Sequence, residues 1–168
     1  MRRADEDDYR EYVAARIERL RRTAYLLCHD WHRADDIVSV TLGRLYRHWQ
    51  RARRIERLDA YVGRMLVNAW HDEGRRASRE TVVEQAAVDH GRPGPDVVER
   101  LSQLELLRRL PPRRREAVVL RFYYDLSVQE TAAALGCSEG TVKSLTSRGL
   151  ESLRALTVLT ETGPTEDR

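Results

Sequence analysis

Residues 127–154 read SVQETAAALGCSEGTVKSLTSRGLESLR, a segment that contains the strongest local signals of structure in the chain. Ser127 with Glu130 three positions later is a capping-box pattern, which predicts the start of a short helix. Gly136 stands where that helix must end, because glycine adopts the left-handed backbone conformation without steric cost. Ser138 then offers an N-cap for a second helix. Two helices joined by a glycine turn predict a helix-turn-helix.

The second helix of this pair separates apolar residues from polar ones. Its apolar stripe recurs at helical spacing and comprises Val142, Leu145, Leu150 and Leu153. The polar side chains expected to face outward are Thr141, Lys143, Ser144, Ser147 and Arg148. A polar, partly basic helix face after a tight turn is the arrangement that enters the major groove of DNA. An ordinary helical hairpin with a solvated face would show the same pattern.

The composition limits the classes of protein that the chain can belong to. Its 168 residues suffice for one domain or two small ones, and 41% apolar residues suffice for a packed core. Charged residues make up 34% of the chain, and no run of about 18 apolar residues exists to span a bilayer. The N-terminal residues also lack the apolar segment of a secretory signal. We therefore expect a cytoplasmic protein without membrane insertion.

The cysteines and histidines do not form a metal-binding pattern. Neither Cys28 nor Cys137 belongs to a CxxC pair, so we expect reduced thiols and no disulfide framework. Cys28, His29 and His32 lie close together in sequence, but no second cluster completes a set of four ligands. We expect no metal site and no cofactor.

The charge is distributed unevenly along the chain. Residues 1–78 contain 17 arginines and 13 acidic residues, a net charge of +4, whereas residues 111–168 contain 8 basic and 8 acidic residues. Contacts with phosphate supply much of the affinity of proteins for DNA. We therefore expect the neutral helix-turn-helix half to bind DNA weakly alone, and better when another factor holds it there.

The pattern of apolar residues predicts an all-α fold, because no stretch alternates with a period of two. The expected helices cover residues 9–29, 33–51, 58–79, 97–110 and 113–124, followed by the helix pair within 127–156. Glycine and proline gather in residues 80–96, which predicts a flexible linker. The predicted organisation is two small helical domains, 1–79 and 97–159, with a disordered tail at 160–168.

Three segments resemble one family. Residues 34–49 read ADDIVSVTLGRLYRHW, and their periodicity alone indicates a core helix. They also resemble the region-two helix of bacterial RNA polymerase sigma factors of the extracytoplasmic-function type. Residues 58–76, LDAYVGRMLVNAWHDEGRR, are similar to that family's helix for DNA melting and minus-ten recognition. Residues 110–154 resemble region four, and TVKSLTSR is similar to the SigE-like actinobacterial branch. Ser39 and Leu145 depart from the family's usual Gln and Arg.

The resemblance implies a transcription initiation subunit that binds core RNA polymerase and promoter DNA and has no enzymatic activity. The residues implied to dock on the polymerase clamp are Asp36, Ile37, Val40, Leu42, Arg44 and Leu45. Those implied to meet the minus-ten element are Tyr61, Arg64, Asn68, Trp70, Asp72, Arg75 and Arg76. Single-stranded bases need stacking surfaces and cationic contacts to phosphate, and this set supplies both. The arginine-rich loop 50–57 would help to hold a flipped base.

The helix-turn-helix would read the minus-thirty-five element as duplex DNA. Lys143 and Arg148 are the main candidates for contacts with guanine edges or phosphate. The secondary candidates are Thr141, Ser144, Thr146 and Ser147.

Two groups of charged residues lie at expected helix starts, and they should interact with the helix dipole in opposite ways. Asp35 and Asp36 fall in the first turn of their helix, where negative charge suits the helix dipole. Arg113, Arg114 and Arg115 open a helix, where positive charge is unfavourable. This favours a phosphate or polymerase contact over a stabilising role, with a solvated cluster as the alternative.

Two other functions fit the sequence less well. A stand-alone helix-turn-helix regulator would need a dimerisation helix, and none is evident. An enzyme would need a nucleophile elbow, a phosphate-binding glycine loop or a histidine-rich metal motif, and the sequence contains none. Members of the family are usually held inactive by an anti-sigma factor, so we expect one as a partner.

Overall fold

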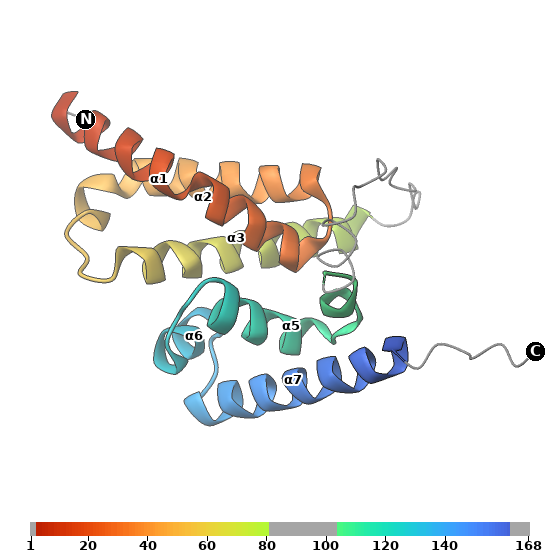
Figure 1. The fold of residues 1–168 in the computed structure, drawn as a ribbon. Helices are drawn as coiled ribbons and strands as arrows, with labels where there is room; N and C mark the ends of the chain where they lie inside the picture. Colours follow the sequence, from red (N-terminus) through yellow and green to blue (C-terminus); the bar gives the residue numbers. More distant parts are fainter. Residues whose placement is uncertain (1–2, 81–103, 162–168) are drawn as a thin grey trace, which may run out of the picture.

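The computed structural model describes residues 3–80 and 104–161, in which every regular element is a helix (Figure 1). Its helices are α1 (Arg3–Cys28), α2 (Trp31–Ala52), α3 (Leu58–Glu80), α5 (Pro112–Val118), α6 (Val128–Leu135) and α7 (Glu139–Glu161). Residues 104–109 are also helical, and a π-helical turn, η1 (Val119–Tyr123), continues α5. The all-α prediction is confirmed.

The predicted linker, and parts of one predicted helix and of the predicted tail, lie outside the described residues. Residues 81–103 and 162–168 are not described, and with them the expected linker and the start of the helix predicted over 97–110. The sequence predicts a tail from residue 160, but α7 continues to Glu161, and the rest of the expected tail lies outside the described residues.

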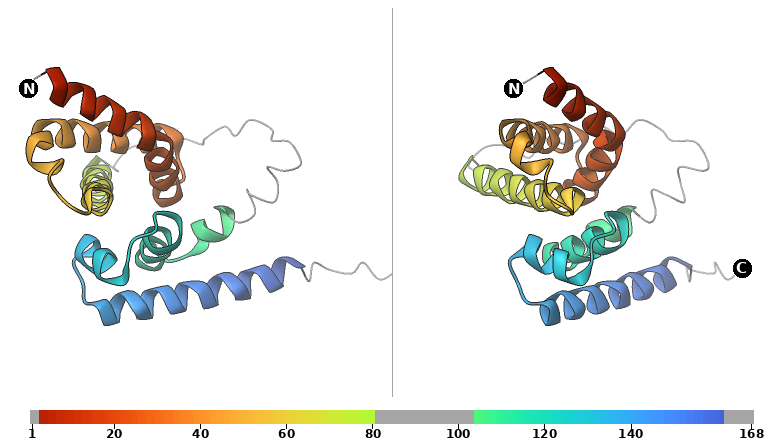
Figure 2. Two further views of the ribbon diagram at one scale, coloured as in Figure 1. Left: turned by 60° about the vertical axis from the view of Figure 1, so that its left-hand side comes forward. Right: turned by 90° about the vertical axis from the view of Figure 1, so that its left-hand side faces the viewer.

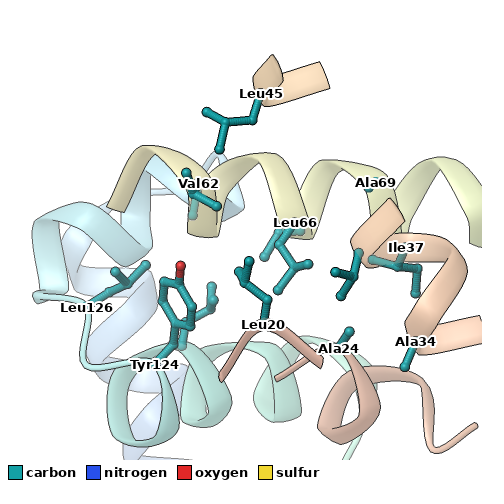
Figure 3. Close-up of a cluster of buried hydrophobic side chains, with 14 of the residues drawn as sticks. Leu20, Ala24, Ala34, Ile37, Leu45, Val62, Leu66, Ala69, Tyr124 and Leu126 are labelled. Atoms are coloured by element: carbon teal, nitrogen blue, oxygen red, sulfur yellow. The ribbon is translucent and has the colours of Figure 1, made fainter. Parts of the chain in front are cut away.

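The first half is a bundle of α1, α2 and α3 around a tightly packed core. Leu20, Ile37, Leu45 and Leu66 are almost completely buried between these helices (Figure 3). Burying each of these side chains stabilises the fold by roughly 1.5–3 kcal/mol relative to leaving it exposed. The periodic apolar positions of the sequence therefore form one contiguous core.

The connection between α1 and α2 is very short. His29 adopts a left-handed conformation with φ of 57°, and the Asp30 side chain accepts a hydrogen bond from the backbone N–H of Arg33. Asp30 is thus the N-cap of α2, which begins at Trp31. The expectation that Asp35 and Asp36 occupy the first turn is wrong, because the helix begins at Trp31, two residues before the predicted start at residue 33.

The second half folds as its local sequence predicts. Ser127 and Glu130 form the complete capping box of α6, and Gly136 ends that helix with φ of 64°. Ser138 accepts a hydrogen bond from the N–H of Thr141, as expected of an N-cap. Gly149 lets α7 approach α5 closely, since a Cβ there would lie 2.7 Å from a methyl group of Val118.

The two halves pack against each other. In Figures 1 and 2, α5 and α6 lie along the three-helix bundle, and α7 lies on their outer side. One buried cluster contains Leu20 and Val62 from the first half together with Tyr124 and Leu126 from the second (Figure 3). The sequence did not indicate how the domains would be placed relative to each other.

Candidate nucleic-acid interfaces

The outer face of α7 is open to solvent at the positions expected to read duplex DNA. Thr141, Lys143, Ser144, Ser147 and Arg148 are all exposed. Within the described residues, neither Lys143 nor Arg148 takes part in an ion pair. The Ser138 cap and the Gly136 turn fix the start of this helix. The side chains therefore stand on a rigid element with their charges available to a ligand.

Thr146 differs from the other positions on α7. It is only 9% exposed, and its hydroxyl donates to the carbonyl oxygens of Val142 and Lys143. The expectation that Thr146 contacts DNA is therefore corrected to a structural role. Leu145 is partly buried and packs against the core. Its leucine therefore has a packing role at a position where the family that the sequence resembles usually has arginine.

Arg113, Arg114 and Arg115 make internal contacts. Arg115 donates four hydrogen bonds, three to carbonyls at the end of the helix formed by residues 104–109 and one, of 3.0 Å, to Leu27 at the end of α1. Carbonyls at helix ends lack partners within the helix, so a guanidinium suits them well. Arg113 similarly reaches the last carbonyl of α6, that of Leu135.

These contacts overturn the expectation for the arginine cluster. Arg115 is partly buried, and this burial lowers the pKa of its guanidinium. The expectation of a phosphate or polymerase contact is wrong for this residue, which joins three segments of the fold. The sequence could not reveal this role, because the carbonyl acceptors lie on two other helices.

The exposed face of α3 carries the residues expected at the minus-ten element. Arg64, Asn68, Asp72 and Arg76 recur at intervals of four, which places them along one side of the helix. Arg64, Asn68, Arg75 and Arg76 are exposed, and Asp72 is half-buried. This face is a second polar and basic surface on the same chain.

Asp72 holds two arginines of this surface. Its carboxylate accepts a 2.9 Å hydrogen bond from Arg44 of α2 and another from Arg75. The Arg44 guanidinium, followed by that of Arg75, lowers the pKa of the Asp72 carboxyl. A carboxylate repels phosphate, so the geometry makes Asp72 a positioning residue for its two arginines.

Tyr61 and Trp70, the expected stacking residues, are both partly buried. Trp70 packs against the core, with the guanidinium of Arg33 lying 5.3 Å from its ring centre. Arg33 is itself fixed by two hydrogen bonds of 2.8 and 2.6 Å to Glu73. The indole of Trp70 is thus held in place, and the Arg33–Glu73 pair was not indicated by the sequence.

Two of the arginines of loop 50–57 are also engaged. Arg53 forms ion pairs with Asp5 and Asp8 near the start of α1. Arg57 reaches Glu130 of α6 over 2.8 Å. The loop expected to hold a flipped base is therefore tied at one end to α1 and at the other to the helix-turn-helix.

The surface of α2 expected to dock on polymerase divides into exposed and buried residues. Asp36 and Val40 are exposed, and Leu42 and Arg44 are half-buried. Ile37 and Leu45 are at most 1% exposed, so the expectation that they contact a partner is corrected to a core role. Asp36, Val40 and Arg44 line a groove of about 550 Å³ between α2 and α3, together with Arg75 and Arg76.

The described residues contain no group of His, Cys, Asp and Glu side chains that could hold a metal ion. Cys28 and Cys137 are free thiols. Among the described helices, none has the length and apolar character needed to cross a membrane.

Comparisons with known families match both halves. The model for sigma-70 region 2 matches residues 13–80, and the model for sigma-70 region 4 matches residues 101–153. The chain is 35% identical over 151 residues to the RNA polymerase sigma-E factor of Streptomyces coelicolor, covering 88% of this chain and 84% of the relative.

Solved structures share the arrangement of helices. The sigma factor RpoE from Bartonella quintana, in a co-crystal structure with the anti-sigma factor NepR, matches with a TM-score of 0.76 and 25% identity, covering 89% of this chain and 96% of the other. CnrH, in complex with the cytosolic domain of CnrY, matches with a TM-score of 0.67 over 92% of this chain and 90% of the other. At 23% identity, the second likeness supports the fold alone.

Proposed function

Since this chain belongs to the extracytoplasmic-function sigma factors of the sigma-70 family, which direct RNA polymerase to promoters, we propose how its parts share that task. The observation that carries the proposal is the presence of two separate polar and basic helix faces, one on α3 and one on α7. A repressor that reads one operator half-site per subunit would need only one such face.

The face of α7 would read the minus-thirty-five element in the major groove. Lys143 and Arg148 are exposed and outside the ion pairs of the described residues, so they can contact guanine edges or phosphate without losing an internal partner. Thr141, Ser144 and Ser147 would add hydrogen bonds around them. The low net charge of this half fits a reader that polymerase holds against DNA.

The face of α3 would meet the minus-ten element as the strands separate. Arg64, Arg75 and Arg76 supply positive charge for the DNA backbone, and Asn68 supplies donors and an acceptor for a base edge. Extruding a base costs a few kcal/mol. Binding to polymerase must offset part of this cost, so the free protein should not melt DNA.

The groove between α2 and α3 would form part of the docking site for core RNA polymerase. Asp36, Val40 and Arg44 place an acid, an apolar side chain and a base beside one another on α2. Arg44 also contacts Asp72, so the proposed polymerase surface and the proposed DNA surface share one ionic network. We further propose that an anti-sigma factor controls this chain, as the complex of RpoE with NepR illustrates for a structural relative.

A pair of matched substitutions tests the docking surface. Val40 and Tyr46 are both 42% exposed on α2 but lie on different sides of the helix. Binding of the purified full chain to core RNA polymerase should be at least tenfold weaker for Val40→Asp, whereas Tyr46→Asp should change it by less than about twofold. If the unsubstituted chain does not bind core polymerase at all, the proposed function is wrong.

A further inference from the structure

Tyr124 lies at the centre of the contact between the two halves. It follows η1 directly and is only 2% exposed (Figure 3). Its hydroxyl donates a 3.1 Å hydrogen bond to the carbonyl oxygen of Asp59 at the start of α3. Its own carbonyl accepts a hydrogen bond from Arg19 of α1, whose guanidinium also lies 4.4 Å from the centre of the ring. One side chain of the second half thus contacts two helices of the first.

Gly63 makes room for this ring on α3. A Cβ atom at position 63 would lie 2.6 Å from Cε1 and 3.1 Å from Cδ1 of Tyr124. Carbon atoms do not approach so closely without displacing one another. Glycine in a helix interior is less favourable than alanine, so local helix stability does not account for this residue. The close approach of the Tyr124 ring explains why position 63 is a glycine.

Polar contacts surround this apolar centre. His71 of α3 lies 2.8 Å from the carboxylate of Glu116 in α5, whose side chain is only 5% exposed. Arg57, just before α3, pairs with Glu130 of α6, and Arg115 reaches the carbonyl oxygen of Leu27 at the end of α1. The contact between the halves is therefore a formed interface with an apolar centre and paired charges.

The proposed function requires the two halves to separate. In this arrangement α3 contacts α6, and α6 contacts α7. Two interaxial distances of 8–10 Å put α7 about 20 Å from α3, and α3 itself is about 35 Å long. The minus-ten and minus-thirty-five elements lie about 25 base pairs apart, which is about 85 Å of duplex at 3.4 Å per base pair. The two faces cannot occupy both elements while the halves remain packed together.

We propose that Tyr124, seated against Gly63, is an intramolecular latch that keeps the free chain closed. The need for opening rests on the proposed function, whereas the latch itself rests only on the packing of the two halves. A closed population lowers the apparent affinity for a ligand that binds the open form. Polymerase and promoter DNA together would then release the latch, and the free chain would rarely hold both elements of a promoter.

Gly63→Ala tests the latch by adding one methyl group. Small-angle X-ray scattering of the full chain, without DNA or polymerase, reports its radius of gyration. The closed form should give about 15 Å for a compact chain of this length, and opening should raise the value by about a third or more. Gly43→Ala is the matched control, because a Cβ at that helical position would meet no atom within 4 Å. This control should leave the radius unchanged.

Tyr124→Ala provides the second variant. It removes the ring, so it should expand the chain by itself, and adding Gly63→Ala to it should cause little further expansion. Far-UV circular dichroism must show that each variant keeps its helical content. Unchanged radii for folded Gly63→Ala and Tyr124→Ala, or equal expansion of the Gly43→Ala control, would overturn the latch. That result would leave the polymerase-binding test unaffected, so failure of the latch and failure of the proposed function can be told apart.

Discussion

The two helix faces that we assign to DNA differ in how far their charges are already engaged. On α7, Lys143 and Arg148 stand exposed and outside the ion pairs of the described residues. On and around α3, Asp72 binds Arg75, and Glu130 binds Arg57. The proposed face for duplex DNA is therefore ready in the free chain, whereas on the proposed minus-ten face Arg75, with the neighbouring Arg57, must exchange an internal partner for DNA.

This difference matches the tasks that the two faces would perform. Reading duplex DNA requires a rigid helix with free donors. Melting is productive only when polymerase is present, and internal ion pairs that compete with phosphate reduce binding to single strands before that point.

Removing the free charges of α7 should have the largest effect. Each specific contact contributes roughly 1–3 kcal/mol, so the double variant Lys143→Ala/Arg148→Ala should lower promoter-specific transcription by core polymerase about 100-fold. Binding to core polymerase should be unchanged. Glu151→Gln, an exposed position on the same helix, is the control and should retain activity. Full activity of the double variant would show that α7 does not read DNA through these residues.

The scaffold beneath this face can be perturbed separately. Gly149→Ala should destabilise the protein by about 1–3 kcal/mol, because its Cβ would press on Val118 in a packed site. Gly140→Ala should be close to neutral, since its Cβ would meet only the Ser138 hydroxyl, at 3.9 Å. Urea unfolding of both variants measures the difference. Equal stability of the two variants would contradict the close packing of α5 and α7.

Releasing the arginines of α3 should strengthen binding to single strands. Asp72→Asn removes the charge that holds Arg44 and Arg75, so affinity for a minus-ten oligonucleotide should rise several-fold at low salt and less at high salt. Asp35→Asn breaks a comparable pair, that of Asp35 with Arg21 at 2.6 Å, away from this face. An equal gain in both variants would mean that net charge alone is responsible.

The smallest effect should appear as a pH dependence of stability. Burial, and then the charges of Arg115 and Arg108, lower the pKa of His29 to about 4. An unfolded histidine titrates near 6.5, so the unfolded chain binds this proton first, and stability should fall as the pH drops from about 6.5 to 4. His29→Asn suits the left-handed backbone and should flatten the dependence of Tm on pH in this window. His48→Asn, exposed on α2, should not flatten it.

The features that the sequence predicted well are those specified by near neighbours. The capping box, the left-handed Gly136 and the Ser138 cap each depend on residues within one helical turn, and all three are present. The apolar periodicity also located α1, α2 and α3 to within a few residues, apart from the start of α1 at Arg3.

The features that could not be predicted depend on partners distant in sequence. Arg115 donates to carbonyl groups on two other helices. Tyr124 donates to the carbonyl oxygen of Asp59 in α3, which precedes it by 65 residues in the sequence. Ile37 and Leu45 were assigned to the wrong surface for a different reason. An amphipathic stripe fits both a core and a docking surface, and only their burial shows that they belong to the core.

Mapping the 5′ ends of transcripts shows whether this chain directs RNA polymerase to promoters. Core RNA polymerase would transcribe fragmented genomic DNA with and without the full chain. We expect new start sites that appear only when the chain is present and that share two upstream sequence elements at a constant spacing. These sites should be lost with the Lys143→Ala/Arg148→Ala variant. If the start sites are the same with and without the chain, it does not direct polymerase to promoters.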